Sequence, residues 1–306
     1  MKIGLHMGYW WGTDIGSDIK AIIAYTAQTG VDYLEINPRY FLHATSQERK
    51  DMRSYAQDLG LGILINGGAG EEADLASDSL ASRKAGVAFW HKMLKAAQDL
   101  AAPVWSGVIY STWLRHPVGP YPQSAEERQR AREYCIASLR ELGHILDDYD
   151  IVIGLEVVNR YEQFLMNTAQ EGVCIAEAAG NDKIQLLLDT FHMNIEEDNM
   201  ADAIRYAADH HRLAHLHAGE SNRRVPCGGG NIHWQEIGAV LKAIDYNGAI
   251  VMEPFVLKNA DNAHRTCTWR NLMEEPIRCE HMVEMARNGA TFLRGLKQQC
   301  RCPITD

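Results

Sequence analysis

The chain has 306 residues, of which 46% are hydrophobic and 23% are charged, a composition typical of a globular protein with a large core. Acidic residues outnumber basic ones by 40 to 30, and the formal charge of −10 argues against a nucleic-acid partner, whose phosphates require a cationic surface. The sequence contains neither a secretory signal nor a run of about 18 apolar residues, so we expect no membrane partner and a cytoplasmic protein.

The seven cysteines are scattered along the chain, and their number is odd. Such usage is typical of a reduced, cytoplasmic protein rather than of a disulfide framework. Cys300 and Cys302 form a CxC pair near the C-terminus. A zinc site needs more ligands than this pair offers, so we assign it no role.

Short apolar segments alternate with longer helical patterns from one end of the chain to the other. The predicted strands cover residues 2–7, 33–36, 61–65, 104–110, 151–158, 184–188, 213–216 and 249–252. The predicted helices cover residues 17–30, 45–60, 82–100, 124–146, 200–210, 234–244 and 276–296, with one more that begins at Thr168. Three of these helices begin with the spacing of a capping box, namely Thr45 with Glu48, Ser124 with Glu127, and Thr168 with Glu171.

Eight strand–helix units predict a (β/α)8 TIM barrel, which needs about 250 residues, as one domain over residues 1–306. A doubly wound sheet would give the same alternation, and counting strands does not exclude it. No GxGxxG follows a predicted strand, so the dinucleotide-binding form of that sheet lacks support. The stretch 256–270 is polar and unpatterned, and we expect it to be a long loop on the side of the active site.

Polar residues interrupt each of the last four predicted strands at its C-terminal end. IVIGL runs into Glu156, IQLLL into Asp189, LAHL into His217 and AIVM into Glu253. A single carboxylate in such a place often caps the next helix or forms an ion pair. Three carboxylates around one point of a barrel repel one another unless a cation lies between them. This pattern therefore predicts a site for a divalent metal.

Oxygen donors dominate this set, which suits an octahedral ion such as Mn²⁺, Co²⁺ or Mg²⁺ better than structural zinc. Four protein ligands leave about two coordination positions for a pair of neighbouring sugar oxygens. His215 and His217 lie in the same strand, and we expect them to point to opposite faces, with one outside the barrel lumen. We select His217 as the ligand.

Further polar residues follow these strand ends, and each has an ordinary alternative explanation. Glu162 belongs either to the site or to a solvated surface. His192 is either functional or a structural histidine whose hydrogen bonds are satisfied. Arg223 either faces the site or pairs with an acidic neighbour.

Four segments resemble the motifs of the D-tagatose 3-epimerase family, which includes the D-allulose (D-psicose) and L-ribulose 3-epimerases. These segments are EVVNRYEQFLMNT, LDTFHMNIEED, HLHAGESNRRVP and VMEPF, and they match in order and spacing over roughly residues 150–256. The second and third are specific in combination. The barrel pattern extends the resemblance over nearly the whole chain and implies a xylose-isomerase-like fold.

The resemblance also implies an activity, which is the metal-dependent inversion of C3 in a free ketose. It implies Glu156, Asp189, His217 and Glu253 as metal ligands, the two glutamates also acting as acid and base. Sugar contacts are implied for Glu162, His192 and Arg223, with Trp113 packing near the substrate. The family forms dimers and tetramers, so we expect a homodimer or homotetramer. The expected small-molecule partner is the ketose substrate.

The N-terminal half departs from the family pattern at four positions near the far end of the sugar. His6 stands where close relatives carry tyrosine or another aromatic residue, and Trp10, Trp11 and Asn66 also differ. We expect His6 to contact the substrate. These differences leave the preferred ketose open among D-fructose/D-allulose, D-tagatose/D-sorbose and L-ribulose/L-xylulose.

Other functions fit the same fold less well. A metal-dependent aldose–ketose isomerase is the first alternative, and it would form an aldose without inverting C3. A metal phosphodiesterase or endonuclease usually holds more metals and histidines, and the negative charge disfavours DNA. A purely sugar-binding barrel does not need two matched glutamates. A phosphorylated substrate is disfavoured because neither a basic cluster nor a phosphate-binding glycine loop is evident.

Overall fold

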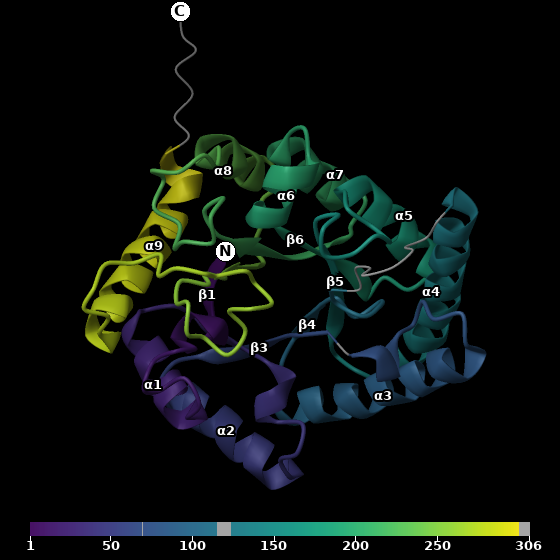
Figure 1. Cartoon of the computed structure of the whole chain (residues 1–306), viewed down its shortest axis with the longest axis horizontal. Helices are drawn as coiled ribbons and strands as arrows, with labels where there is room; N and C mark the ends of the chain where they lie inside the picture. The colour runs from purple at the N-terminus through teal and green to yellow at the C-terminus, as the bar shows by residue number, and fades with distance from the viewer. Residues whose placement is uncertain (69, 115–123, 300–306) are drawn as a thin grey trace, which may run out of the picture.

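The computed structural model describes residues 1–68, 70–114 and 124–299, and its strands close into a single parallel barrel. Figure 1 shows the strands at the centre with the helices in a ring around them. In order around the barrel, the strands are β1 Lys2–His6, β2 Tyr33–Ile36, β3 Gly62–Asn66, β4 Val104–Gly107, β5 Val152–Val157, β6 Ile184–Asp189, β7 Leu213–Ala218 and β8 Ala249–Met252. The predicted (β/α)8 fold is confirmed.

The α-helices lie outside the strands. They are α1 Ile19–Gln28, α2 Ser46–Asp58, α3 Leu80–Asp99, α4 Ala125–Leu146, α5 Ala169–Ala179, α6 Thr190–Glu196, α7 Met200–Asp209, α8 Trp234–Ala243 and α9 Cys279–Gln299. Three short 3-10 helices cover Met7–Trp10, Pro38–Tyr40 and Glu71–Ala73. Cys300 and Cys302 lie outside the described residues.

Several boundaries differ from those predicted. The helix α6 was not predicted, because its seven residues are too few to show a helical period. The strand β4 ends at Gly107, where φ is +133° and the chain turns, instead of continuing to residue 110. The loop after β8 continues to residue 278, so α9 begins three residues later than predicted.

The predicted helix caps form to different extents. Thr45 and Glu48 make the complete, reciprocal capping box before α2. Thr168 makes only half of one before α5, since its side chain accepts from the Glu171 N–H. The Glu171 carboxylate turns instead to the backbone N–H of Asn167 and to Arg132. The Glu171 carboxylate thus links the start of α5 to α4 and to the residue before the N-cap.

The core has two parts, one between the strands and the helices and a small one inside the barrel. The inner cluster consists of Leu64, Ala249 and Val251, with Tyr33 and Val104 packed against it. Three of these five residues are the first of their strands, so the cluster fills the amino-terminal end of the lumen. Polar side chains occupy the opposite end, where the strands finish.

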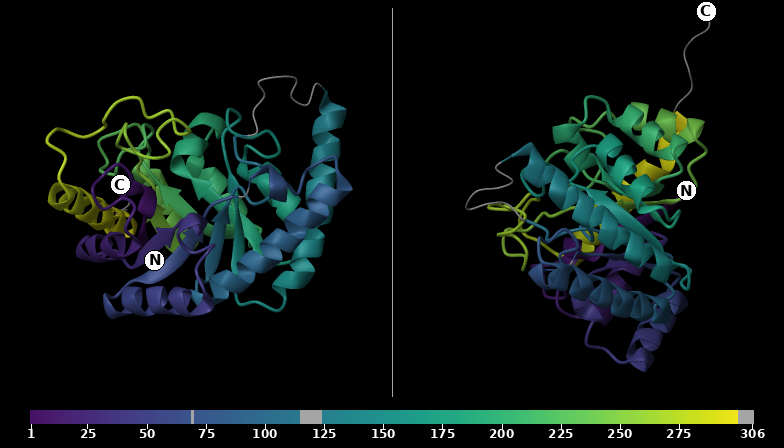
Figure 2. Two further views of the ribbon diagram at one scale, coloured as in Figure 1. Left: turned by 60° about the horizontal axis from the view of Figure 1, so that its bottom comes forward. Right: turned by 90° about the vertical axis from the view of Figure 1, so that its right-hand side faces the viewer.

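Close packing in this lumen requires a glycine at position 4. A Cβ on Gly4 would lie 2.7 Å from the Val251 Cγ2 atom, closer than real side chains approach. The side views of Figure 2 show the long loop between β8 and α9, in yellow-green, rising beyond the strands at one end of the barrel. None of the helices in the described part of the chain is long and apolar enough to cross a membrane.

Candidate active site

Four polar residues meet at the carboxyl ends of the last four strands. Glu156 lies in β5, Asp189 ends β6, His217 lies in β7, and Glu253 directly follows β8. The β6–β7 register places Asp189 directly beside His217. One ligand atom from each of the four lies within 4.8 Å of all the others, and all four residues are buried. The predicted convergence is present in the structure.

This group fits a divalent cation in its donor chemistry. Three carboxylates and one imidazole supply mostly hard oxygen donors. The His217 Nδ1 atom is buried and has no hydrogen-bond partner, although it lies 3.3 Å from a Glu253 oxygen. In its neutral form, His217 can direct an Nδ1 lone pair at a metal ion shared with the three carboxylates.

Arg223 also faces this group and balances part of its negative charge. Its Nη1 atom lies 2.5 Å from Asp189 Oδ2 and 2.6 Å from Glu253 Oε2. The guanidinium lies over the Phe191 ring, 4.1 Å from its centroid. Burial lowers the pKa of Arg223, but Asp189 and Glu253 outweigh that effect and raise it, so the side chain stays cationic.

The backbone of the loop after β7 aims this arginine. Arg223 adopts a left-handed conformation with φ of +63°, which is uncommon for residues other than glycine. Its N–H donates to the Glu220 carbonyl at 2.8 Å, and its own carbonyl accepts from the Phe255 N–H at 3.1 Å. Both neighbouring loops therefore hold the residue in this conformation.

Charges within the cluster shift the pKa values of its members. Burial alone would lower the pKa of His217, but Glu35 and Glu253 raise it well above its ordinary value. Burial would raise the pKa of Glu253, yet His217 and Arg223 hold it well below the usual range. The Glu253 carboxylate is therefore ionised at neutral pH.

A second set of hydrogen bonds runs along one side of the pocket. The Trp113 indole N–H donates to Glu162 Oε2 at 2.8 Å. Asn159 donates from its side chain to Glu162 Oε1 at 2.9 Å and from its backbone N–H to His192 Nδ1 at 3.2 Å. The other His192 nitrogen lies 3.3 Å from Arg223 Nη2. The predicted sugar-contact residues therefore lie together.

Asn159 was missed in the sequence, although it lies within the EVVNRYE segment between two selected glutamates. Its buried amide links Glu162 to His192. A polar residue at the first position after a predicted barrel strand was the available signal. Burial lowers the pKa of His192, but Glu162, Glu156 and Asp189 raise it above the ordinary value.

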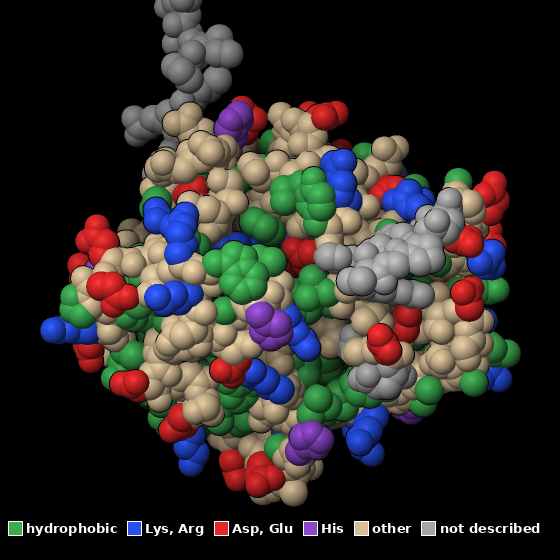
Figure 3. Space-filling view, viewed as in Figure 1, with side chains coloured by type: hydrophobic (Ala, Val, Ile, Leu, Met, Phe, Trp, Pro, Cys, Tyr) green, Lys and Arg blue, Asp and Glu red, His purple; other side chains and the backbone are tan. Residues whose placement is uncertain are grey.

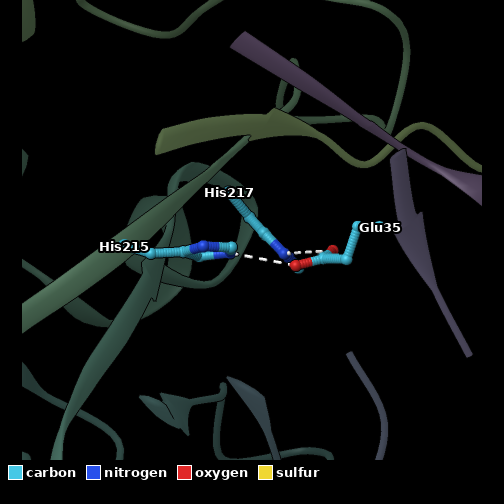
Figure 4. A group of neighbouring side chains, drawn as sticks. All are labelled: Glu35, His215 and His217. Atoms are coloured by element: carbon cyan, nitrogen blue, oxygen red, sulfur yellow. Dashed lines mark hydrogen bonds and ion pairs between the residues drawn. The ribbon is translucent and has the colours of Figure 1, made fainter. Parts of the chain in front are cut away.

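The expectation for His215 was wrong. Successive residues of a strand alternate between faces, so residues two apart share a face. Both His215 and His217 point into the lumen, where each approaches the carboxylate of Glu35 on β2, as Figure 4 shows. Sequence reasoning also missed Glu35, whose signal was a lone carboxylate in the apolar run of Tyr33–Ile36.

The four N-terminal residues that differ from the family pattern lie in different places. His6, Trp11 and Asn66 line the pocket. Trp10 does not, because it is fully buried in the core and donates from its indole N–H to Thr26 at 2.9 Å. We had placed Trp10 near the sugar, and the structure corrects this. The His6 ring makes edge-to-face contacts with Trp11 and Phe255.

A pocket of about 1160 Å³ opens at this end of the barrel. Of the four clustered residues, Glu156 and Glu253 line it, whereas Asp189 and His217 are fully buried and do not. Residues 261–262 and 264–270 of the β8–α9 loop form part of its wall, which confirms the predicted position of that loop. The two glutamates are thus the members of the cluster that face a bound molecule.

The wall of the pocket carries more arginine and histidine side chains than the sequence suggested. Arg39, Arg265, Arg270 and His264 all line it. Arg39 lies over the Trp11 ring and pairs with Asp261 at 3.2 Å. Figure 3 shows basic and histidine side chains beside hydrophobic ones over the middle of this face. Three of these residues lie within seven positions of the β8–α9 loop, and Arg39 joins them from the 3-10 helix after β2.

Comparisons with known proteins agree with this fold. Residues 23–274 match the family described as the xylose isomerase-like TIM barrel. A D-psicose 3-epimerase of Enterocloster bolteae is 36% identical over 95% of this chain and 93% of its own. An L-ribulose 3-epimerase of Mesorhizobium japonicum is 30% identical over 89% of this chain and 88% of its own. A crystal structure of D-psicose 3-epimerase with D-tagatose, from Clostridium cellulolyticum H10, aligns with a TM-score of 0.90 and 33% identity over 97% of this chain and 99% of that one.

The fold and the first of these matches define the class, which is the xylose isomerase-like barrel. Within that class the chain belongs to the D-psicose 3-epimerase family of ketose 3-epimerases. It is a carbohydrate epimerase, an enzyme of the isomerase class.

Proposed function

We propose that the enzyme inverts C3 of a free ketose with Glu156 and Glu253 as its acid–base pair, at a site that binds one divalent cation. The single observation that carries this proposal is a division within the four-residue cluster. Glu156 and Glu253 line the pocket, whereas Asp189 and His217 lie beneath them with 0% of their surface exposed. Two glutamates can thus reach the substrate while all four residues hold the cation.

Mn²⁺ or Co²⁺ is the proposed cation, with Mg²⁺ as the next choice, because carboxylates and one imidazole suit octahedral ions. Glu156, Asp189, His217 and Glu253 would hold it, and their ligand atoms are close enough to share one ion. Once bound, the cation would act as a Lewis acid on the C2 carbonyl and favour the enediolate of the sugar.

Inversion of C3 requires a base on one face of the carbon and an acid on the other. The C3 hydrogen is acidic because the C2 carbonyl accepts the charge left by the departing proton. Glu156 lies in β5 and Glu253 directly follows β8, and β6 and β7 separate these two strands, so we expect their carboxylates to approach the sugar from different directions. In one direction of the reaction one glutamate removes the proton and the other supplies a new one; in reverse they exchange roles.

The remaining pocket residues would orient the sugar. Arg223 and His192 would bind O1 and O2, where a positive guanidinium offsets the developing oxyanion. Glu162, held by Trp113 and Asn159, would accept from a sugar hydroxyl. His6 would contact the far end. The substrate pair would be D-fructose/D-allulose, D-tagatose/D-sorbose or L-ribulose/L-xylulose.

Substitution of the two glutamates tests the acid–base roles. We expect Glu156→Gln and Glu253→Gln each to lower kcat by about 10²–10⁴-fold, because a glutamine cannot exchange a proton in this way. Product formed by the wild type in D₂O should carry deuterium at C3. Glu236→Gln, an exposed glutamate on α8, is the matched control and should retain activity. Near-native turnover in either active-site variant would contradict the two-base scheme.

A panel of ketoses with Mn²⁺, analysed by chromatography, would identify the preferred substrate. Formation of an aldose without the C3 epimer would favour the alternative of an aldose–ketose isomerase. A phosphorylated ketose belongs in the same panel, because Arg39, Arg265 and Arg270 line the pocket wall in addition to Arg223. The homodimer or homotetramer stays a prediction, which light scattering on the purified enzyme would test.

A further inference from the structure

We propose that Glu35 is a positioning residue that presents the Nδ1 lone pair of His217 to the cation. This inference rests on the proposed cation site and deepens it. Glu35 lies in β2, in the half of the barrel that supplies none of the four ligands. Its carboxylate reaches across the lumen to β7, which is separated from β2 by β8 and β1.

The two nitrogens of His217 face two different carboxylates. Nε2 lies 2.9 Å from Glu35 Oε2, and Nδ1 lies 3.3 Å from Glu253 Oε2. Figure 4 shows the imidazole directed at the Glu35 carboxylate across the lumen. Glu35 and His217 are both 0% exposed, so water does not compete for this contact.

A histidine binds a cation only as a neutral imidazole, whose chemistry decides where the one remaining proton lies. One ring nitrogen carries hydrogen and the other carries a lone pair, and a carboxylate can only accept. Nε2 must therefore be the donor to Glu35. Nδ1 is left as a lone pair directed at the cluster of Glu156, Asp189 and Glu253. A carboxylate bound to the far nitrogen of a metal-ligating histidine fixes its tautomer and ring orientation and raises its basicity.

His215 approaches the other oxygen of the same carboxylate. Its Nε2 lies 3.1 Å from Glu35 Oε1, but neither of these atoms has a hydrogen-bond partner, so the contact is electrostatic rather than an aligned bond. His215 is also 0% exposed. Its role in this arrangement is to keep the carboxylate charged and in place, with a smaller effect than that of Glu35 itself.

Glu35, His215 and His217 are also close enough to hold an ion among themselves. Separations of 2.9 and 3.1 Å are those of directly paired imidazoles and carboxylates, and complete burial leaves an ion no direct contact with solvent. Positioning therefore explains the geometry without a second ion. The two arrangements differ in which His217 nitrogen carries the proton, and this difference can be measured.

The first experiment uses the wild-type protein loaded with Zn²⁺, a diamagnetic probe. Nitrogen-15 NMR of the histidine rings should show His217 protonated at Nε2, with that proton protected from exchange. A proton at Nδ1 would place the ion among Glu35, His215 and His217 and would overturn the proposal. This readout depends on neither turnover nor any variant.

The second experiment measures Mn²⁺ affinity by calorimetry in Glu35→Gln and Glu35→Asp. Loss of the carboxylate from the far nitrogen should weaken binding by about 10–100-fold in Glu35→Gln, and Glu35→Asp should retain more affinity because it keeps the charge. The matched control is Asp74→Asn, another buried carboxylate, which binds the Ala76 N–H and the Ser111 hydroxyl. Its Mn²⁺ affinity should equal that of the wild type.

The outcomes separate this inference from the proposed function. Absence of Mn²⁺ binding in the wild-type protein would contradict the proposed cation site itself. A wild type that binds Mn²⁺, with Glu35→Gln equal to it within about twofold, would overturn only the positioning role, because the expected loss is about tenfold or more. Two Mn²⁺ per wild-type chain and one per Glu35→Gln chain would assign Glu35 as a ligand and overturn it too. If Glu35→Gln does not fold, Glu35→Asp and the NMR readout still decide.

Discussion

The ends of β5 to β8 and the ends of β1 to β4 face one lumen but differ in chemistry. The second half of the barrel provides the buried group of three carboxylates and one imidazole. The first half ends in neutral or weakly polar side chains, among them His6, Asn66 and Ser106, together with one carboxylate, Glu35. Burial lowers the pKa of His6, which makes it a neutral hydrogen-bonding group at pH 7.

Under the proposed function, this difference would separate reaction from recognition. Charged groups that would bind a cation and move a proton are concentrated in one half, where repulsion among them is balanced by Arg223. The other half shapes the pocket with His6, Trp11 and Asn66. Substitutions in the second half should therefore affect turnover, and substitutions in the first half should affect the choice among ketoses.

Removal of the metal is expected to have the largest effect. Dialysis against a chelator should lower kcat by about 10³-fold or more. Loss of the Lewis acid would raise the activation barrier by several kcal/mol, and about 1.4 kcal/mol corresponds to a tenfold slower rate. Addition of Mn²⁺ or Co²⁺ should restore activity. Full activity in a sample whose metal content is verified as absent would remove the basis for assigning the reaction to the second half.

Arg223 is expected to come next. Arg223→Met should lower kcat by about 10²–10³-fold, since a cation beside the sugar oxygens is lost together with the balance of charge between Asp189 and Glu253. Steady-state kinetics with the preferred ketose would measure this. Arg224→Met removes the exposed neighbouring arginine and should stay close to wild type. Equal kinetics in the two variants would contradict the role of Arg223.

Replacement of His6 should change selectivity more than rate. His6 lines the pocket, and its Nδ1 accepts from the Gly8 N–H at 3.1 Å. Its Nε2 is thus a buried donor without a partner among the described residues. His6→Phe deletes this donor and should change the ratio of kcat/KM between two ketoses by about tenfold. His6→Tyr returns a hydroxyl and should change that ratio less. An unchanged ratio in both variants would show that position 6 does not contribute to recognition.

A carboxylate outside the pocket should affect stability alone. Burial raises the pKa of Glu171, but the Asn167 N–H, Arg132 and Arg128 outweigh it and lower the pKa below its usual range. Its stabilising contribution is therefore present at neutral pH and lost as the pH falls through the depressed pKa. Glu171→Gln should lower the free energy of unfolding by about 1–2 kcal/mol at pH 7, with normal kcat.

Thermal unfolding of Glu171→Gln and the wild type at several pH values checks this. The difference in Tm should be a few degrees at pH 7 and should disappear in acid, where both side chains are uncharged. A difference that persists unchanged at low pH would show that Glu171 stabilises through packing instead of charge.

Local sequence predicted the parts of this protein whose physical cause is local. Strand and helix alternation follows from hydrophobic period and caps, and most of the predicted elements are present. The four strand-end residues were visible because each interrupts an apolar run at a place where a barrel brings its strands together. The family motifs fall in the same region, and they contain most of the residues proposed for binding and proton transfer.

The roles of residues in the N-terminal half were harder to predict from the sequence, because they depend on contacts with residues far along the chain. Glu35 stands 182 residues before His217, and only closure of the barrel brings the two together. Trp10 and Trp11 are adjacent, yet one packs in the core and the other faces the pocket.

The sequence by itself determined the barrel, the family and the identity of the four clustered residues, because periodicity and motif spacing are properties of short segments. Tertiary structure alone decided which of the four face the pocket and that His215 and His217 share one carboxylate. These depend on the closure and register of eight strands, and contacts between strands distant in the chain leave no local pattern.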